Sequence, residues 1–185
     1  MSCRITQGIE NSCDDVLRVG GLGRTFWVGY LSDLDTPIPL TQLADISVLD
    51  FGAYGGLVRF DGRKFSHSYT VELVSTAGGN KSFRHTFTPK VLSKTTADNL
   101  TLKQLALADD IFIVVDDNNG GYAILGGGNG LSVDSTSKTS GTTGDSDSST
   151  TITLTGSETT QELILNIGGA ATTLAYIENL ETQYA

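Results

Sequence analysis

Few side chains in this sequence have a type and spacing that would support catalysis or metal binding. The two histidines, His67 and His85, each need carboxylate or further histidine partners before they can hold a metal ion or act as a general base. Only Glu72 lies near them in the sequence. We therefore expect these histidines, which could face each other across a hairpin, to have a structural or surface role.

Three other patterns look like sites but lack what the chemistry requires. Cys13 precedes two aspartates, and negative neighbours raise the pKa of a thiol and suppress the reactive thiolate. The segment ILGGGNG, residues 124–130, is not followed by the lysine and hydroxyl residue of a phosphate-binding loop. Asp145, Asp147 and Glu158 resemble a calcium loop without its central glycine and correctly placed glutamate. The sequence thus predicts no enzyme activity, no cofactor and no metal site.

The chain has a net charge of −9, and its excess of acidic over basic side chains lies in the second half. Residues 1–104 carry 11 basic and 10 acidic side chains, whereas residues 105–185 carry one lysine and 11 acidic side chains. An acidic surface repels phosphates and disfavours a protein that grips nucleic acid. It suits a surface past which DNA moves without sticking, and it equally suits a protein that only needs solubility.

The cysteines and the apolar runs indicate a soluble product of the cytoplasm. Cys3 and Cys13 are too close in sequence to staple a fold, so free thiols in a reducing compartment are expected. The N-terminus has no apolar core of signal-peptide length, and no run approaches the roughly 20 apolar residues of a membrane span. We expect no membrane anchor.

The pattern of apolar residues predicts a single, mainly β domain over residues 1–185. The clearest element is a hairpin of residues 111–115 and 122–125, joined by Asp, Asn and Gly. Its first strand is apolar throughout, so we expect it to be buried on both faces. Further strands are predicted at 24–34, 44–51 paired with 55–60, 65–76 paired with 82–92, 131–133, 150–156 and 161–167.

Two helices and two irregular segments complete the prediction. Residues 95–108 form the best helix, with Thr95 or Thr96 as the cap and an apolar stripe to pack across the open face of the sheet. The stripe consists of Leu100, Leu102, Leu105 and Leu107. A short helix is expected at 172–184. Residues 1–21 are interpreted as an arm, and residues 134–149 as an exposed loop with almost nothing to bury.

Taken together, several segments resemble the tail tube proteins, or major tail proteins, of bacteriophages with long tails. The resemblance rests on the order and spacing of these segments and includes no catalytic signature. They are ITQGIENSCDDVLRVGGLGRTFWVGYLSDLD at 5–35, FSHSYTVEL at 65–73, LALADDIFIVVDDNNGGYAILGGGNGL at 105–131, SGTTGDSDS at 140–148 and TITLTGSE at 151–158. Residues 159–185 go beyond the family pattern as a C-terminal extension.

The resemblance implies a β-sandwich or half-barrel of antiparallel strands with one flanking α-helix. Six subunits would join their sheets into one ring barrel, and rings would stack into a tube in the virion tail. Such a protein is made in the cytoplasm of the host bacterium. Its partners would be copies of itself and other tail and neck proteins, and DNA would contact it only in passing through the lumen.

The same resemblance suggests which residues meet other subunits and which face the lumen. The 1–21 arm, the 134–149 loop and the 159–185 extension are candidates for contacts between subunits or rings. Candidate interface side chains are Trp27, Tyr30, Tyr54, Asp145, Asp147 and Tyr176. Candidate lumen-facing side chains, on the polar face of the long hairpin, are Ser68, Thr70, Glu72, Arg84 and Thr86.

Other functions remain open on the sequence alone. A β-sandwich binding or adhesion module would use Trp27, Tyr30 and Tyr54 as a contact platform. A neck or tail-completion protein would share the fold but form a single ring. An enzyme is the third alternative, and no pair of titrating groups in the sequence can be matched to a mechanism.

Overall fold

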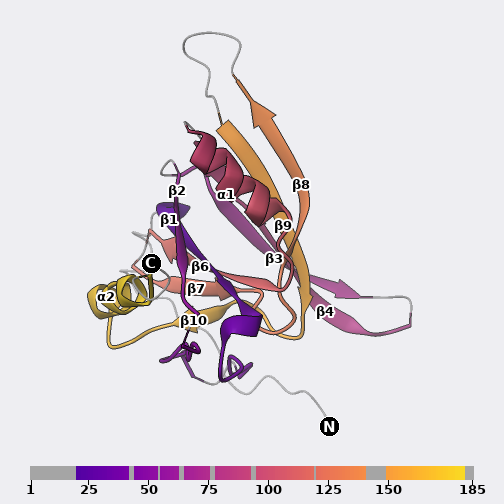
Figure 1. The fold of residues 1–185 in the computed structure, drawn as a ribbon. Helices are drawn as coiled ribbons and strands as arrows, with labels where there is room; N and C mark the ends of the chain where they lie inside the picture. Colours follow the sequence, from indigo (N-terminus) through magenta and orange to yellow (C-terminus); the bar gives the residue numbers. More distant parts are fainter. Residues whose placement is uncertain are drawn as a thin grey trace.

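The computed structural model describes residues 20–41, 44–53, 55–62, 65–75, 78–92, 95–118, 120–140 and 149–181. These residues form two antiparallel β-sheets and two α-helices (Figure 1). The mainly β prediction is therefore confirmed, and the short helix expected at 172–184 is present at Ala170–Glu181. The N-terminal arm up to residue 19 and the candidate interface residues Tyr54, Asp145 and Asp147 lie outside the described residues.

The first sheet is built around the predicted hairpin. Its strand order is β10 (Leu163–Leu165), β7 (Tyr122–Leu125), β6 (Ile111–Asp117), β1 (Leu22–Tyr30) and β2 (Val58–Asp61). Residues 111–115 of β6 are each at most 1% exposed, so this strand is buried on both faces as its apolar run predicts.

The second sheet contains the long hairpin, which is also confirmed. Its strands are β3 (Ser68–Ser75), β4 (Lys81–Thr88), β5 (Lys90–Val91), β8 (Ser132–Thr139) and β9 (Ser149–Glu158). β9 is central, with β4 and β5 along one edge and β8 along the other. β3 pairs with β4 over its whole length.

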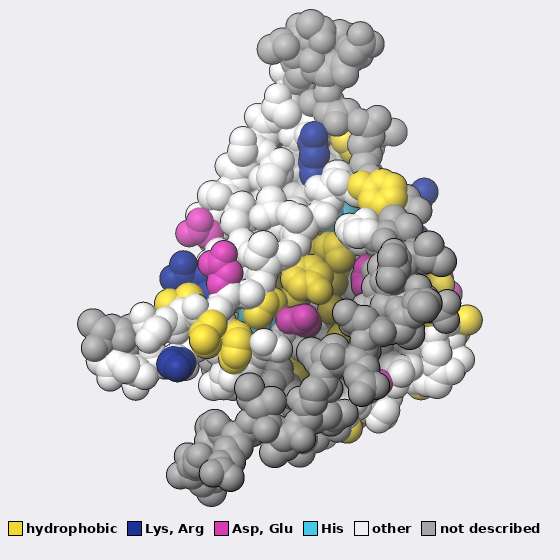
Figure 2. All heavy atoms as spheres, turned by 180° about the vertical axis from the view of Figure 1, so that it is seen from behind, with side chains coloured by type: hydrophobic (Ala, Val, Ile, Leu, Met, Phe, Trp, Pro, Cys, Tyr) yellow, Lys and Arg dark blue, Asp and Glu magenta, His cyan; other side chains and the backbone are white. Residues whose placement is uncertain are grey.

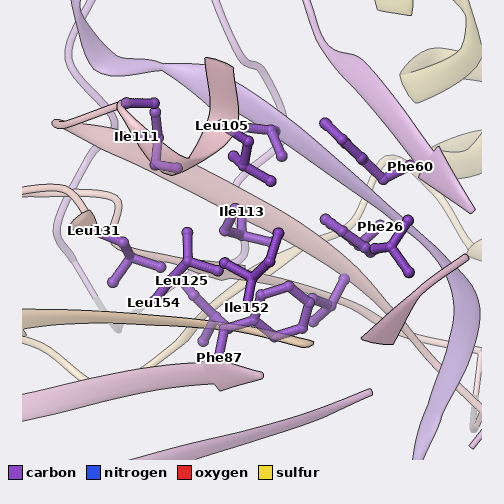
Figure 3. Packing of buried hydrophobic residues seen from close by; sticks show 14 of the residues in the cluster. Phe26, Phe60, Phe87, Leu105, Ile111, Ile113, Leu125, Leu131, Ile152 and Leu154 are labelled. Atoms are coloured by element: carbon purple, nitrogen blue, oxygen red, sulfur yellow. The ribbon is translucent and has the colours of Figure 1, made fainter. Parts of the chain in front are cut away.

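Two hydrophobic clusters lie on opposite sides of the first sheet because its strands alternate their side chains between the two faces. Phe26 of β1 and Ile113 of β6 face the second sheet, where they join Phe87 and Ile152 (Figure 3). Trp27, Phe112 and Val114 lie on the opposite face of the first sheet. They face α2 (Ala170–Glu181) and residues between β1 and β2. The C-terminal extension thus completes a core of its own chain, through β10 and α2.

The flanking helix α1 (Thr96–Ala106) begins as predicted. The Thr95 side chain accepts a hydrogen bond from the Asp98 backbone N–H, and the Asp98 carboxylate accepts one from the Thr95 N–H. Leu102 and Leu105 are buried in the cluster between the sheets. The predicted apolar stripe is wrong in its other half, because Leu100 and Leu107 are 57% and 74% exposed.

Two further predictions from local pattern are wrong. Residues 44–51 form no strand among those described and make only isolated bridges, such as Ile46 with Leu165, because β2 pairs with β1 instead. The loop predicted at 134–149 is strand β8 as far as Thr139, and its last residue opens β9. β8 has few apolar residues to bury, so its backbone pairing with β9 holds it in place.

Candidate functional site

The outer face of the second sheet carries hydroxyl side chains from edge to edge. One row runs across four strands: Thr70 lies opposite Thr86, Thr86 opposite Thr155, and Thr155 opposite Ser132. Apart from Glu72, Val74, Arg84 and Lys90, every paired position on this face is serine or threonine. We call this surface the hydroxyl face; its other members include Ser68, Ser82, Thr88, Ser135, Ser137, Thr151, Thr153 and Ser157.

The sequence produces this face through strict alternation. In β9, Ile152 and Leu154 point into the core at 0% exposure, while the threonines between them point outward. All five residues predicted for the lumen, namely Ser68, Thr70, Glu72, Arg84 and Thr86, share this face. The sequence analysis missed the contributions of β8 and β9, although the repeated Ser/Thr at every second position was a usable signal.

The charges on the hydroxyl face are placed opposite each other. Glu72 of β3 pairs in register with Arg84 of β4, and both side chains are exposed. Lys90 of β5, opposite Thr151, is the third charged residue among the paired positions of this face. These positions therefore carry one basic side chain in excess, in contrast to the acidic chain.

The hydroxyl face belongs to a sheet with two open edges. β3 and β8 are its outermost strands within the described part of the chain, and most of their side chains are exposed. The strands are also staggered, since β4 pairs with β9 at Leu154–Glu158 and β8 pairs with it at Ser149–Thr155. A stagger of this kind is the geometry that a barrel needs in order to close.

The candidate interface aromatics are mostly used within the chain. Trp27 is 2% exposed, and its Nε1 donates to the carboxylate of Glu181 in α2, so the prediction that Trp27 presents a contact surface is wrong. Tyr176 is half-buried; its hydroxyl accepts from the backbone N–H of Leu49 and donates to the Leu49 carbonyl, both at 2.9 Å. Tyr30 is half-buried against the cluster between the sheets.

Both histidines are buried and bonded to backbone on both sides of the ring. His67 Nδ1 accepts from Lys90 N–H at 3.1 Å, so Nε2 carries the proton and faces the Arg24 carbonyl at 3.2 Å. His85 Nδ1 accepts from Gly126 N–H, with Nε2 directed at the Thr160 carbonyl at 3.0 Å. Burial lowers the pKa of His67, and the bond to the Arg24 carbonyl opposes this only in part. Neither ring is presented to a substrate.

The glycine-rich segment is held by a buried carboxylate. Glu158 is 2% exposed and accepts hydrogen bonds from the backbone N–H groups of Asn129 and Gly130 at 3.0 and 3.2 Å. The N–H groups that would cradle a phosphate are therefore already engaged by a side chain of the same protein. Within the described residues, no group of three or more His, Cys, Asp or Glu side chains has a metal-binding arrangement.

Comparison of the chain with models of protein families, with curated proteins and with solved structures found no match in any of the three. Neither described helix is long and apolar enough to cross a membrane. The function must therefore be inferred from the sheet itself, its hydroxyl face and its open edges.

Proposed function

We propose that this chain is the subunit of a bacteriophage tail tube, in which rings of about six copies stack around a channel for the genome. The observation that carries the proposal is the second sheet: four main strands, both outer edges open, and one face made of hydroxyl groups. The segments that resemble tail tube proteins add support from the sequence.

The number of strands favours closure between identical copies. In the order β3, β4, β9, β8, successive strands are antiparallel, so β3 and β8 run in opposite directions. When β8 of one copy meets β3 of the next, the alternation continues across the joint without a parallel pair. Each copy then satisfies one open edge of its neighbour, and a closed ring has no edge left to aggregate.

The size of such a ring suits a channel. Six copies would contribute about 24 strands, and barrels of 16–18 strands already leave an aqueous channel. Because the opposite face of the sheet is buried against the core, the hydroxyl face is the one that would line the channel.

The chemistry of the hydroxyl face suits a wall past which DNA moves. Affinity for DNA comes mainly from lysine and arginine contacts to phosphates. On this face Arg84 lies opposite Glu72, Lys90 is the one further charged side chain among the paired positions, and the other polar side chains there are neutral. The wall would therefore be wetted by water and would neither grip nor strongly repel the phosphates.

An adhesion module is less well supported, because its proposed aromatic platform included Trp27, which is buried. A single-ring neck protein would use the same sheet and differs only in whether rings stack. Both alternatives predict different particles from a tail tube, so imaging distinguishes them.

Negative-stain electron microscopy of the purified protein over a range of concentrations tests the proposal. Stacked rings or hollow tubes are expected; single rings would indicate a neck protein, and monomers at every concentration would overturn the proposal. The double substitution Ser135→Lys and Ser137→Lys places like charges along the β8 edge and should leave folded, unassembled protein. The matched control is Ala171→Lys with Ala175→Lys on the exposed side of α2, which should assemble normally.

A further inference from the structure

An apolar groove lies between helix α1 and the edge of the first sheet. Its floor contains Val28 and Phe60, which belong to the core between the sheets and are at most 8% exposed. Leu107 forms part of its wall and is 74% exposed. The groove has a volume of about 580 Å³, and its accessible apolar surface comes from Leu107 and from the half-buried Tyr30 and Val58.

Acidic residues stand where this groove meets the end of α1. Asp109 is exposed and lines the groove, and the exposed Asp110 follows it. A fitting partner would present two or three large apolar side chains for the floor and a positive charge at this acidic end.

The same chain presents such a surface at the far end of the β3–β4 hairpin, which projects from the body of the molecule (Figure 1). Leu73 and Phe83 lie directly opposite each other on the core-facing side of the hairpin, beyond the part that is covered by the core. Leu73 is 58% exposed and Phe83 is half-buried. Lys81 lies two residues before Phe83, on the same side, and is exposed. Figure 2 shows apolar, basic and acidic side chains side by side in this region.

We propose that the hairpin end of one copy docks into the α1 groove of a second copy. Leu73 and Phe83 cover the groove floor, and Lys81 meets Asp109. The opposite charges at the two surfaces select a second copy as the occupant: Lys81 stands beside an apolar pair on the hairpin, and Asp109 stands beside apolar residues in the groove.

This contact is heterologous, because each copy offers one hairpin and one groove. It can therefore propagate from copy to copy in a ring or along a stack. It uses neither β8 nor the hydroxyl face and shares only strand β3 with the tail tube joint, so variants at β8 and at Leu73 test the two contacts separately.

Charge reversal with mixing tests the contact. Lys81→Glu and Asp109→Lys should each weaken self-association at least tenfold in sedimentation velocity, because like charges then meet at the joint. Mixing the two variants should restore association, since both types of joint between unlike variants again pair opposite charges. Matched controls are Lys103→Glu, which points away from the groove, and Glu178→Lys on α2; both should associate like the wild type.

Leu73→Asp tests the apolar part and should also weaken association at least tenfold while far-UV circular dichroism stays unchanged. Three results would overturn the inference: a wild type that stays monomeric up to its solubility limit, charge variants that associate normally, or weakened variants that mixing does not restore. If tubes form and Leu73→Asp leaves them intact, the docking contact fails while the tail tube proposal stands. If Leu73→Asp abolishes association but the β8 lysine substitutions do not, the docking contact stands and the tail tube proposal fails.

Discussion

The Nδ1 atom of His67 accepts a hydrogen bond from the backbone N–H of Lys90, which fixes the imidazole in its neutral form with the proton on Nε2. This bond lies where the two sheets meet, since Gly62 at the end of β2 bridges to Val91 of β5. The ring also packs edge-on against Phe26. Protonation of His67 would replace an acceptor with a donor facing another N–H, so the junction between the sheets depends on a neutral histidine.

Stability should therefore fall in mild acid. The folded-state pKa of His67 is lowered below the ordinary 6.5, mainly by burial. Below about pH 6.5 the unfolded chain therefore binds a proton at His67 more readily than the folded chain does. The contribution of neutral His67 to the free energy of unfolding is fully present above about pH 6.5 and is lost as the pH falls through the lowered folded pKa. Urea unfolding at about pH 7.5 and about pH 5.5 measures it, a window in which most carboxylates stay ionised.

His67→Gln serves as the comparison in the same experiment, because an amide can accept from Lys90 N–H and does not titrate. The variant should be less stable than the wild type at the higher pH and should lose less stability on acidification. Equal pH dependence in both proteins would show that His67 does not contribute to it.

Removal of the Glu158 carboxylate should loosen the glycine-rich segment. Glu158→Ala leaves the part-buried N–H of Asn129 and the buried N–H of Gly130 without their carboxylate acceptor, and each hydrogen bond to a charged group contributes about 1.5–3 kcal/mol. We expect the free energy of unfolding to fall by about 3 kcal/mol in chemical denaturation. Hydrogen exchange at residues 128–130 should quicken. Glu178→Ala, at an exposed position, should change stability by less than about 0.5 kcal/mol.

A charge in the first sheet should prevent folding. Val114 is 0% exposed and lies in the cluster shared with α2, so Val114→Asp buries an unpaired carboxylate. Insoluble protein is expected on expression. Val48→Asp is the control, because Val48 is 58% exposed and should tolerate the same change. Soluble, folded Val114→Asp protein would mean that this strand is not the core element described above.

Cations on the hydroxyl face should make the protein hold DNA. Thr86→Lys with Thr155→Lys adds two neighbouring positive charges to a face whose paired positions otherwise have a single one in excess, that of Lys90. We expect retained folding, and DNA binding in co-sedimentation that weakens as salt rises, with a steeper salt dependence than the wild type. The control is Ala171→Lys with Ala175→Lys, which adds the same charge on α2. Equal DNA binding by both double variants would show that the position on this face is irrelevant.

The sequence by itself determined the elements whose signals are local. The 111–115 and 122–125 hairpin and the Thr95 cap of α1 follow from apolar runs, turn residues and a short-range hydrogen-bonded box, none of which needs distant partners. The absence of a recognisable catalytic pattern was equally a local observation. Alternation in residues 65–76 and 82–92 was also sufficient to place the predicted lumen candidates on one face.

Only the tertiary structure decided which strands pair and which side chains are covered. β2 pairs with β1 across about 30 residues of sequence, and polar β8 is a strand because β9 offers it backbone partners. The burial of single residues depends on the tertiary structure in the same way, because an apolar side chain is buried or exposed according to what packs over it. Trp27 is covered by a helix more than 140 residues further along the chain, whereas nothing covers Leu107 at the end of α1 to the same extent.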